Sequence, residues 1–183
     1  MRNKAYNFST YSFRIGDEIL VDANIWLYLF PAPMNSQERF ATQYSHGFSR
    51  MISDGAQPVL DPLVLSEYLN RYCRIEWAGQ YNTQYPYFKD FRKSQDFQQV
   101  AQTASVFAKR ILTMCSIHNT PAKDLDVAQA IDDFETAAVD FNDSLLVDVC
   151  RKHGFKLLTN DADFQSGGIE VLTTNPRLLQ ACV

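Results

Sequence analysis

Acidic side chains recur along this chain at positions from which their carboxylates could hold a divalent cation. Asp22 ends an apolar run, and Glu67 lies early in an amphipathic stretch. Asp143 opens a late apolar run, and Asp161 and Asp163 follow another. Mg²⁺ prefers oxygen ligands, and a carboxylate cluster without a cation would suffer mutual repulsion. These residue types therefore predict a metal site that positions a water molecule and neutralises phosphate charge.

Each acid also has a purely structural interpretation. Asp22 could simply begin the next helix, and the helix dipole could favour Asp143 in a first turn. Glu67 could form an ion pair with Arg71 one turn later, and the aspartates of the segment TNDAD could be turn residues. Cap and turn residues would scatter freely along the chain, whereas these acids recur at corresponding ends of strand–helix units. That recurrence favours a shared site.

The elements that must position the acids alternate between strand and helix. Short apolar runs predict strands, and apolar residues at helical spacing predict helices. The alternation predicts a single α/β domain with a parallel sheet and helices on both faces. Ligands of such sheets bind at the carboxyl ends of the strands, where the acids should meet. The expected strands are 18–22, 58–60, 156–158 and 169–172, and the expected helices are 24–30, 36–53, a helix from residue 62, 94–118, 127–136 and 142–153.

Particular residues mark the ends of several of these helices. Ser36 is a candidate N-cap, and Asp61-Pro62 combines a capping carboxylate with proline at the first helical position. Gly154 is expected just past the end of the late helix. The segment 80–93 is rich in Tyr and Phe and is expected to be a loop-like insertion. It could stack unpaired bases, form a satellite core or dock a partner.

Composition limits the class of protein. The 183 residues fit one domain, with 1–17 expected as an N-terminal extension and 18–183 as the main domain. No cysteine belongs to a C-x-x-C pair and the histidines are isolated, so the sequence indicates neither a zinc site nor a histidine-based dyad. No apolar stretch reaches the length of a membrane span and no signal peptide is evident, which predicts a cytoplasmic protein. The net charge of −4 argues against nucleic-acid binding, unless bound cations reverse the local charge at the acidic residues.

Three segments carry a resemblance to a known family. They read ILVDANIWL, SEY and DFNDSLLVDVCRKHGFKLLTNDADF, and the last is the most specific. From about Ile19 to Leu172 the chain resembles the PIN domain, in particular the VapC-type endoribonuclease toxins. The resemblance implies a PIN-like α/β fold and a nuclease that cuts RNA with Mg²⁺ or Mn²⁺.

The resemblance also implies roles for individual residues. The catalytic carboxylates and metal ligands would be Asp22, Glu67, Asp143 and Asp161, with Asp163 as an auxiliary metal ligand and Asn24, Thr159 and Asn160 in support. Asp140 competes with Asp143 for the third position, and the apolar helical run that starts at Asp143 favours the latter.

The same resemblance implies an RNA substrate, a homodimer and, for a toxin, an antitoxin protein as partner. The residues before Asp22 and the 80–93 insertion depart from many toxins of this type and leave the substrate open. One alternative is a non-catalytic RNA-binding or scaffold protein on the PIN fold, which would be expected to have lost some of the acids. Asp22-x-Asn24 also resembles the start of phosphotransferases with an aspartyl nucleophile, but the second aspartate of that motif is missing.

Overall fold

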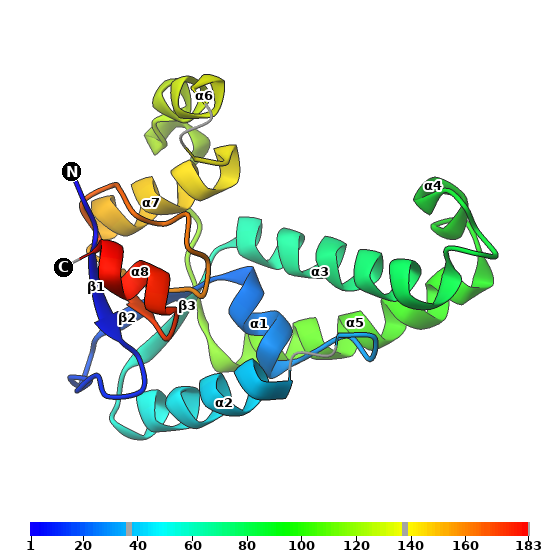
Figure 1. Cartoon of the computed structure of the whole chain (residues 1–183), viewed down its shortest axis with the longest axis horizontal. Helices are drawn as coiled ribbons and strands as arrows, with labels where there is room; N and C mark the ends of the chain where they lie inside the picture. The colour runs from blue at the N-terminus through cyan, green and yellow to red at the C-terminus, as the bar shows by residue number, and fades with distance from the viewer. Residues whose placement is uncertain (36–37, 137–138, 183) are drawn as a thin grey trace.

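A six-stranded parallel sheet lies toward the end of the protein that carries both termini (Figure 1). The computed structural model describes residues 1–35, 38–136 and 139–182. Within these residues the strand order is β1-β6-β5-β2-β3-β4, and each neighbouring pair is parallel. The strands are β1 (Lys4–Asn7), β2 (Glu18–Val21), β3 (Gln57–Leu60), β4 (Ser116–Ile117), β5 (Lys156–Leu158) and β6 (Glu170–Thr173).

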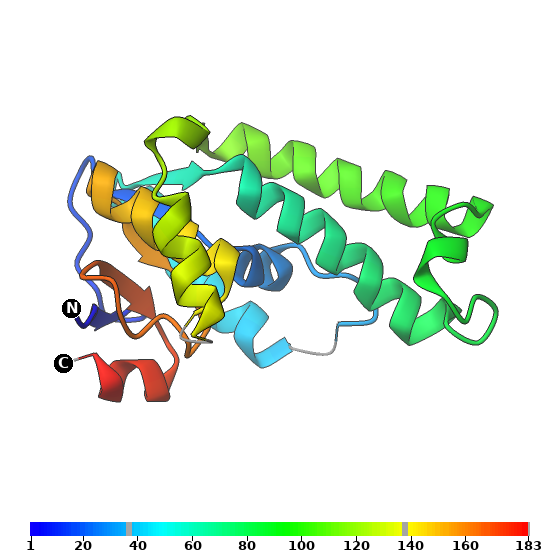
Figure 2. The same cartoon turned by 90° about the horizontal axis from the view of Figure 1, so that it is seen from above.

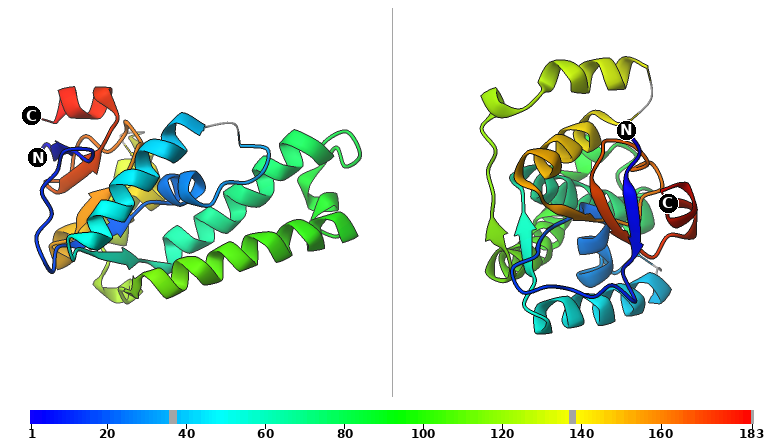
Figure 3. Two further views of the ribbon diagram at one scale, coloured as in Figure 1. Left: turned by 90° about the horizontal axis from the view of Figure 1, so that it is seen from below. Right: turned by 90° about the vertical axis from the view of Figure 1, so that its left-hand side faces the viewer.

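Helices cover both faces of this sheet, which confirms the predicted α/β architecture. They are α1 (Ala23–Leu29), α2 (Glu38–Ser53), α3 (Pro62–Glu76), α4 (Phe88–Phe91), α5 (Gln95–Met114), α6 (Val127–Glu135), α7 (Phe141–His153) and α8 (Pro176–Ala181). Viewed from the end that carries both termini, α2 and α7 lie on opposite sides of the strands (Figure 3). The helices α3 and α5 pack along each other and extend well beyond the sheet, with α4 at their far end (Figures 1 and 2).

The middle of the sheet is buried from both sides. In β2, the side chains of Ile19, Leu20 and Val21 are fully buried, and Leu20 pairs with Val59 of β3 and Leu157 of β5. Continuous apolar strands of this kind are typical of parallel sheets that have helices on both faces. In the part of the chain that the structure describes, no helix is long and apolar enough to cross a membrane.

Two of the predicted helix boundaries are confirmed. Asp61 caps α3 by accepting a hydrogen bond from the backbone N–H of Leu63, and Pro62 occupies the first turn. Gly154 follows α7 with a φ of 72°, the left-handed conformation that favours glycine at a helix end. The proposed cap Ser36 lies outside the described residues, and α2 begins at Glu38.

The expectation of a loop over 80–93 was wrong in part. The segment contains α4, and it follows a short π-helical turn, η1 (Trp77–Tyr81). The Trp77 indole N–H donates to the Tyr85 carbonyl at 2.8 Å, and the rings of Tyr81 and Phe91 stack at 4.9 Å. The aromatic side chains therefore fold back on one another and order the chain between α3 and α5.

The edges of the sheet differ most from the expectations. The predicted helix 94–118 ends at Met114, because residues 116–117 leave it to form β4 beside β3. Within the segment 1–17, which was expected to be an extension, β1 pairs in register with β6. The sequence pattern predicted neither edge strand, since each is short and gains its backbone partners only from a distant strand.

Candidate active site

Asp22 lies at the carboxyl end of β2, where it directly precedes α1. Its side chain makes no capping hydrogen bond to α1, so the helix-start interpretation does not account for it. Instead the buried carboxylate accepts hydrogen bonds from the Thr159 hydroxyl at 2.6 Å and the Asn24 amide. Burial raises the pKa of Asp22 to about 6 even though the Thr159 bond opposes the rise, and the charges of Glu67 and Asp161 add to it.

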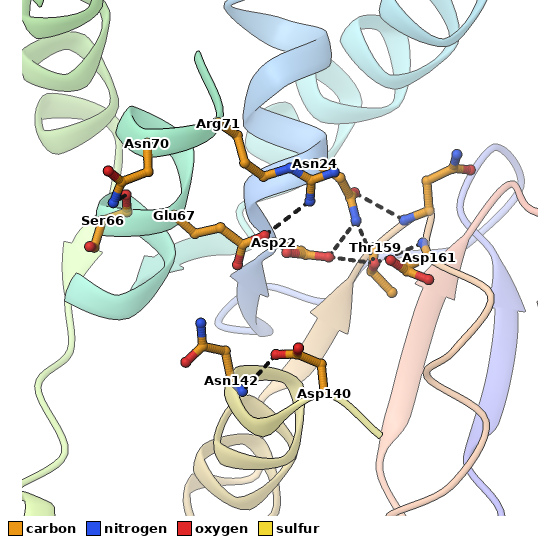
Figure 4. Close-up of polar contacts among 11 residues, drawn as sticks. Asp22, Asn24, Ser66, Glu67, Asn70, Arg71, Asp140, Asn142, Thr159 and Asp161 are labelled. Carbon is orange, nitrogen blue, oxygen red and sulfur yellow. Dashed lines mark hydrogen bonds and ion pairs between the residues drawn. The ribbon is translucent and has the colours of Figure 1, made fainter. Parts of the chain in front are cut away.

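A polar network behind Asp22 holds its neighbours in place (Figure 4). The backbone N–H of Asn160 donates to the Asn24 side chain at 3.2 Å. The Asn160 amide donates to the Tyr28 hydroxyl and accepts from the Tyr44 hydroxyl at 2.9 Å. Asn24, Thr159 and Asn160, the three predicted supporting residues, thus form one network, which the two tyrosines complete. No local pattern in the sequence indicated Tyr28 or Tyr44, because Asn160, which both hydroxyls contact, is far from them in sequence.

Asp161 and Asp163 follow β5 in a turn. The backbone N–H of Asp163 donates to the Asp161 carboxylate at 3.1 Å, as the turn interpretation predicts. The N–H of Asp161 donates to the Thr159 hydroxyl at 3.0 Å, which is also the donor to Asp22. The turn therefore fixes Asp161 close to Asp22, and its structural role does not exclude a role in the site.

Asp140 and Asp143 have different roles at the start of α7. Asp140 is the N-cap, and its carboxylate accepts from the backbone N–H of Asn142 at 3.0 Å. Asp143 lies in the first turn and is half-buried. Burial raises its pKa to about 8, and the nearby negative charges, led by those of Asp22 and Asp161, contribute to the rise. The capping role of Asp140 favours Asp143 as the third acid of the site.

Glu67 projects from the second turn of α3. Its carboxylate forms an ion pair with Arg71 at 3.0 Å, as the structural interpretation of Glu67 predicted (Figure 4). Both residues line a cavity of about 410 Å³, referred to below as the carboxylate pocket. The pocket is lined by Asp22, Asn24, Glu67, Arg71, Asp140, Asn142, Asp143, Asp161 and Asp163. No sequence pattern indicated Asn142 at the pocket, because only the geometry of the first turn of α7 directs it there.

The carboxylate pocket collects acids from four separate parts of the chain. They come from the end of β2, from α3, from the start of α7 and from the turn after β5. All of these donors are oxygens, the ligand type that suits Mg²⁺ and Mn²⁺. Within the described residues, no three acidic, histidine or cysteine side chains gather closely enough to hold a metal ion as they stand. Asp22 binds Thr159 and Asn24 through its Oδ2 atom and could keep these bonds while its other oxygen binds a metal ion, whereas Glu67 would have to give up its ion pair with Arg71.

Comparison with known proteins agrees with this architecture. A model of the PIN domain family matches residues 19–170. No curated protein matches the chain in sequence. Among solved structures, the chain is similar to the structure of VapBC2 from Rickettsia felis bound to a fragment of promoter DNA. The two share 15% sequence identity with a TM-score of 0.53, and the match covers 85% of this chain and 98% of that one. It is also similar to PAE2754 from Pyrobaculum aerophilum, with 15% identity, a TM-score of 0.50, and coverage of 90% of this chain and 95% of that one.

Proposed function

Since the chain belongs to the PIN domain family, we propose that it is a metal-dependent endoribonuclease that hydrolyses RNA phosphodiester bonds at the carboxylate pocket. One observation carries the proposal: acids from four parts of the chain converge on one cavity, where burial and mutual repulsion raise the pKa of Asp143 to about 8. Such convergence opposes folding unless a cation relieves it, and sites of this kind are typical of function rather than stability.

Asp22, Glu67, Asp143 and Asp161 would hold Mg²⁺ or Mn²⁺, with Asp163 at the exposed side of the pocket. A bound ion would supply a nucleophilic water and stabilise charge on the phosphate. The protein's own contribution is orientation. Thr159 and Asn24 fix the Asp22 carboxylate, and Asn160 anchors this network to α1 and α2 through two tyrosine hydroxyls.

A non-catalytic RNA-binding or scaffold protein on the same fold is the second candidate. Such a protein would have no need to retain repelling carboxylates in a half-buried pocket, because phosphate binding alone is weakened by negative charge. All four acids are present and line the pocket, and this favours the nuclease.

We also infer an antitoxin partner and a homodimer, which would make the protein the toxin of a toxin–antitoxin pair. The resemblance to VapC-type toxins and the similarity of the fold to VapBC2 support this part of the proposal.

The nuclease proposal is tested by incubating the purified protein with a structured RNA and Mg²⁺ or Mn²⁺. We expect cuts in exposed loops, which EDTA abolishes. A double variant, Asp22→Ala with Asp143→Ala, is the control for contaminating nuclease. Equal cutting by this variant would show that the activity does not belong to the carboxylate pocket.

A further inference from the structure

Arg71 is the one basic side chain among the described residues that line the carboxylate pocket, where six acids surround it. Its side chain is 50% exposed, whereas that of its ion-pair partner Glu67 is 24% exposed. The guanidinium extends from α3 over the pocket toward Asp22 and Asn24 (Figure 4). Arg71 is therefore placed where a negatively charged ligand entering the pocket would meet it.

The guanidinium has capacity for a further partner. It carries five N–H donors, and within the described residues its hydrogen bond is the one to Glu67 at 3.0 Å. An ion pair one helical turn apart that is open to solvent contributes little to stability. The Arg71–Glu67 pair is thus weak enough to exchange.

We propose that Arg71 is the phosphate-binding residue of the site and that it exchanges Glu67 for a phosphodiester of the RNA. The inference rests on the proposed function. Once a divalent cation engages Glu67, the guanidinium loses its partner and can bind two phosphate oxygens with its planar fork. The protein carries a net charge of −4, so the positive charge of Arg71 gives the pocket, as far as its lining is described, a means of holding an anionic strand.

The test measures RNA binding rather than cleavage. A fluorescent single-stranded RNA is titrated with protein in Ca²⁺, under conditions in which the wild type leaves the RNA intact, at several salt concentrations. The variants are Arg71→Gln, which removes the charge, and Arg71→Lys, which keeps the charge without the fork. Arg74→Gln is the matched control, since Arg74 lies on the same helix but stacks over Phe88 at 4.5 Å and does not line the pocket.

We expect Arg71→Gln to weaken RNA binding about tenfold and to reduce the slope of log affinity against log salt by about 0.7, the value for one phosphate contact on a single strand. Arg71→Lys should keep the slope and lose part of the affinity, and Arg74→Gln should match the wild type. The increase in melting temperature with Mn²⁺ should persist in Arg71→Gln, because the acids remain.

Two results would overturn the inference. If Arg71→Gln binds RNA with the affinity and salt dependence of Arg74→Gln while the wild type cuts RNA, Arg71 is only the counter-ion of Glu67, and the proposed function stands. A wild type that neither binds nor cuts RNA with any divalent cation overturns the proposed function and this inference together.

Discussion

The Thr159 hydroxyl donates a hydrogen bond of 2.6 Å to the Asp22 carboxylate across 137 residues of sequence. The bond joins the carboxyl end of β5 to that of β2, two neighbouring strands of the sheet. The same hydroxyl accepts from the backbone N–H of Asp161. Thr159 therefore sets the relative positions of two of the proposed metal ligands.

Replacing Thr159 by Val should remove this donor at nearly constant volume. Loss of a group that orients a metal ligand typically lowers metal affinity or activity about 10- to 100-fold. Calorimetric titration with Mn²⁺ and an RNA cleavage assay would measure the loss. Thr120→Val is the control, because Thr120 is also a buried threonine but its hydroxyl contacts His118, which does not line the pocket. Equal Mn²⁺ affinity in both variants would argue against an orienting role for Thr159.

Asp143→Asn should abolish activity without lowering the stability of the metal-free protein. The change removes a repelling charge, so the metal-free variant should be as stable as the wild type or more stable, but inactive and less stabilised by Mn²⁺. For the wild type, a metal concentration of 100 times Kd should add about 2.7 kcal/mol to the free energy of unfolding. Thermal melts in EDTA and in Mn²⁺ measure both effects.

Asp140→Asn is the matched comparison, since asparagine caps helices as well as aspartate does. We expect this variant to keep its cleavage activity. If Asp143→Asn instead melts several degrees lower in EDTA and keeps the full response to Mn²⁺, Asp143 is a structural residue and its assignment to the site is wrong.

The raised pKa values of Asp143 and Asp22 should make their contribution to the stability of the metal-free protein fall as pH rises. The pKa of Asp143 is raised from 3.8 to about 8, so between these values the folded state binds a proton that the unfolded chain has released. The contribution of Asp143 to the free energy of unfolding is therefore fully present below about pH 4. It declines as pH rises toward 8 and does not change further above that pH. Asp22, with its pKa raised to about 6, should add to the lower part of this decline.

Thermal melts in EDTA between about pH 5 and pH 8 would show the decline as a falling melting temperature. Asp143→Asn should flatten the upper part of the curve. A wild-type curve with the same pH dependence as that of Asp143→Asn would contradict the pKa shift of Asp143.

A homodimer is expected in solution. Several apolar side chains of α5 are exposed, including Val106 at 57%, and a second subunit could cover them. Light scattering at micromolar concentration should give twice the chain mass of 21.0 kDa. Val106→Glu would place a charge on this surface and should shift the protein toward the monomer. A wild-type mass of about 21 kDa would reject the dimer.

An inhibitory partner protein is expected to insert a basic side chain into the carboxylate pocket. An arginine of the partner would bind the carboxylates bidentately and take the place of the metal. Affinity purification from the native host should recover a small partner, and the complex should not bind Mn²⁺. Recovery of the chain alone, together with harmless overexpression of active enzyme, would argue against this partner.

The sequence by itself determined the elements whose signals are local. Asp61-Pro62 starts α3 and Gly154 ends α7, because a capping carboxylate, a fixed proline φ and a left-handed glycine each act within one turn. The alternation of strands and helices determined the α/β class. Because parallel strands present their carboxyl ends at one edge, the sequence also indicated that Asp22 and Asp161 would lie together.

Only the tertiary structure decided the features that depend on contacts between residues far apart in sequence. Residues 116–117 continue a helical pattern, yet they form β4 because the open edge of β3 offers backbone hydrogen bonds that outweigh local propensity. Asp140 and Asp143 both lie at the start of α7 and both line the pocket, and only the direction of its side chain makes Asp140 the helix cap. The bond between Thr159 and Asp22 likewise exists only once β2 and β5 are adjacent, because no local rule relates residues so far apart in sequence.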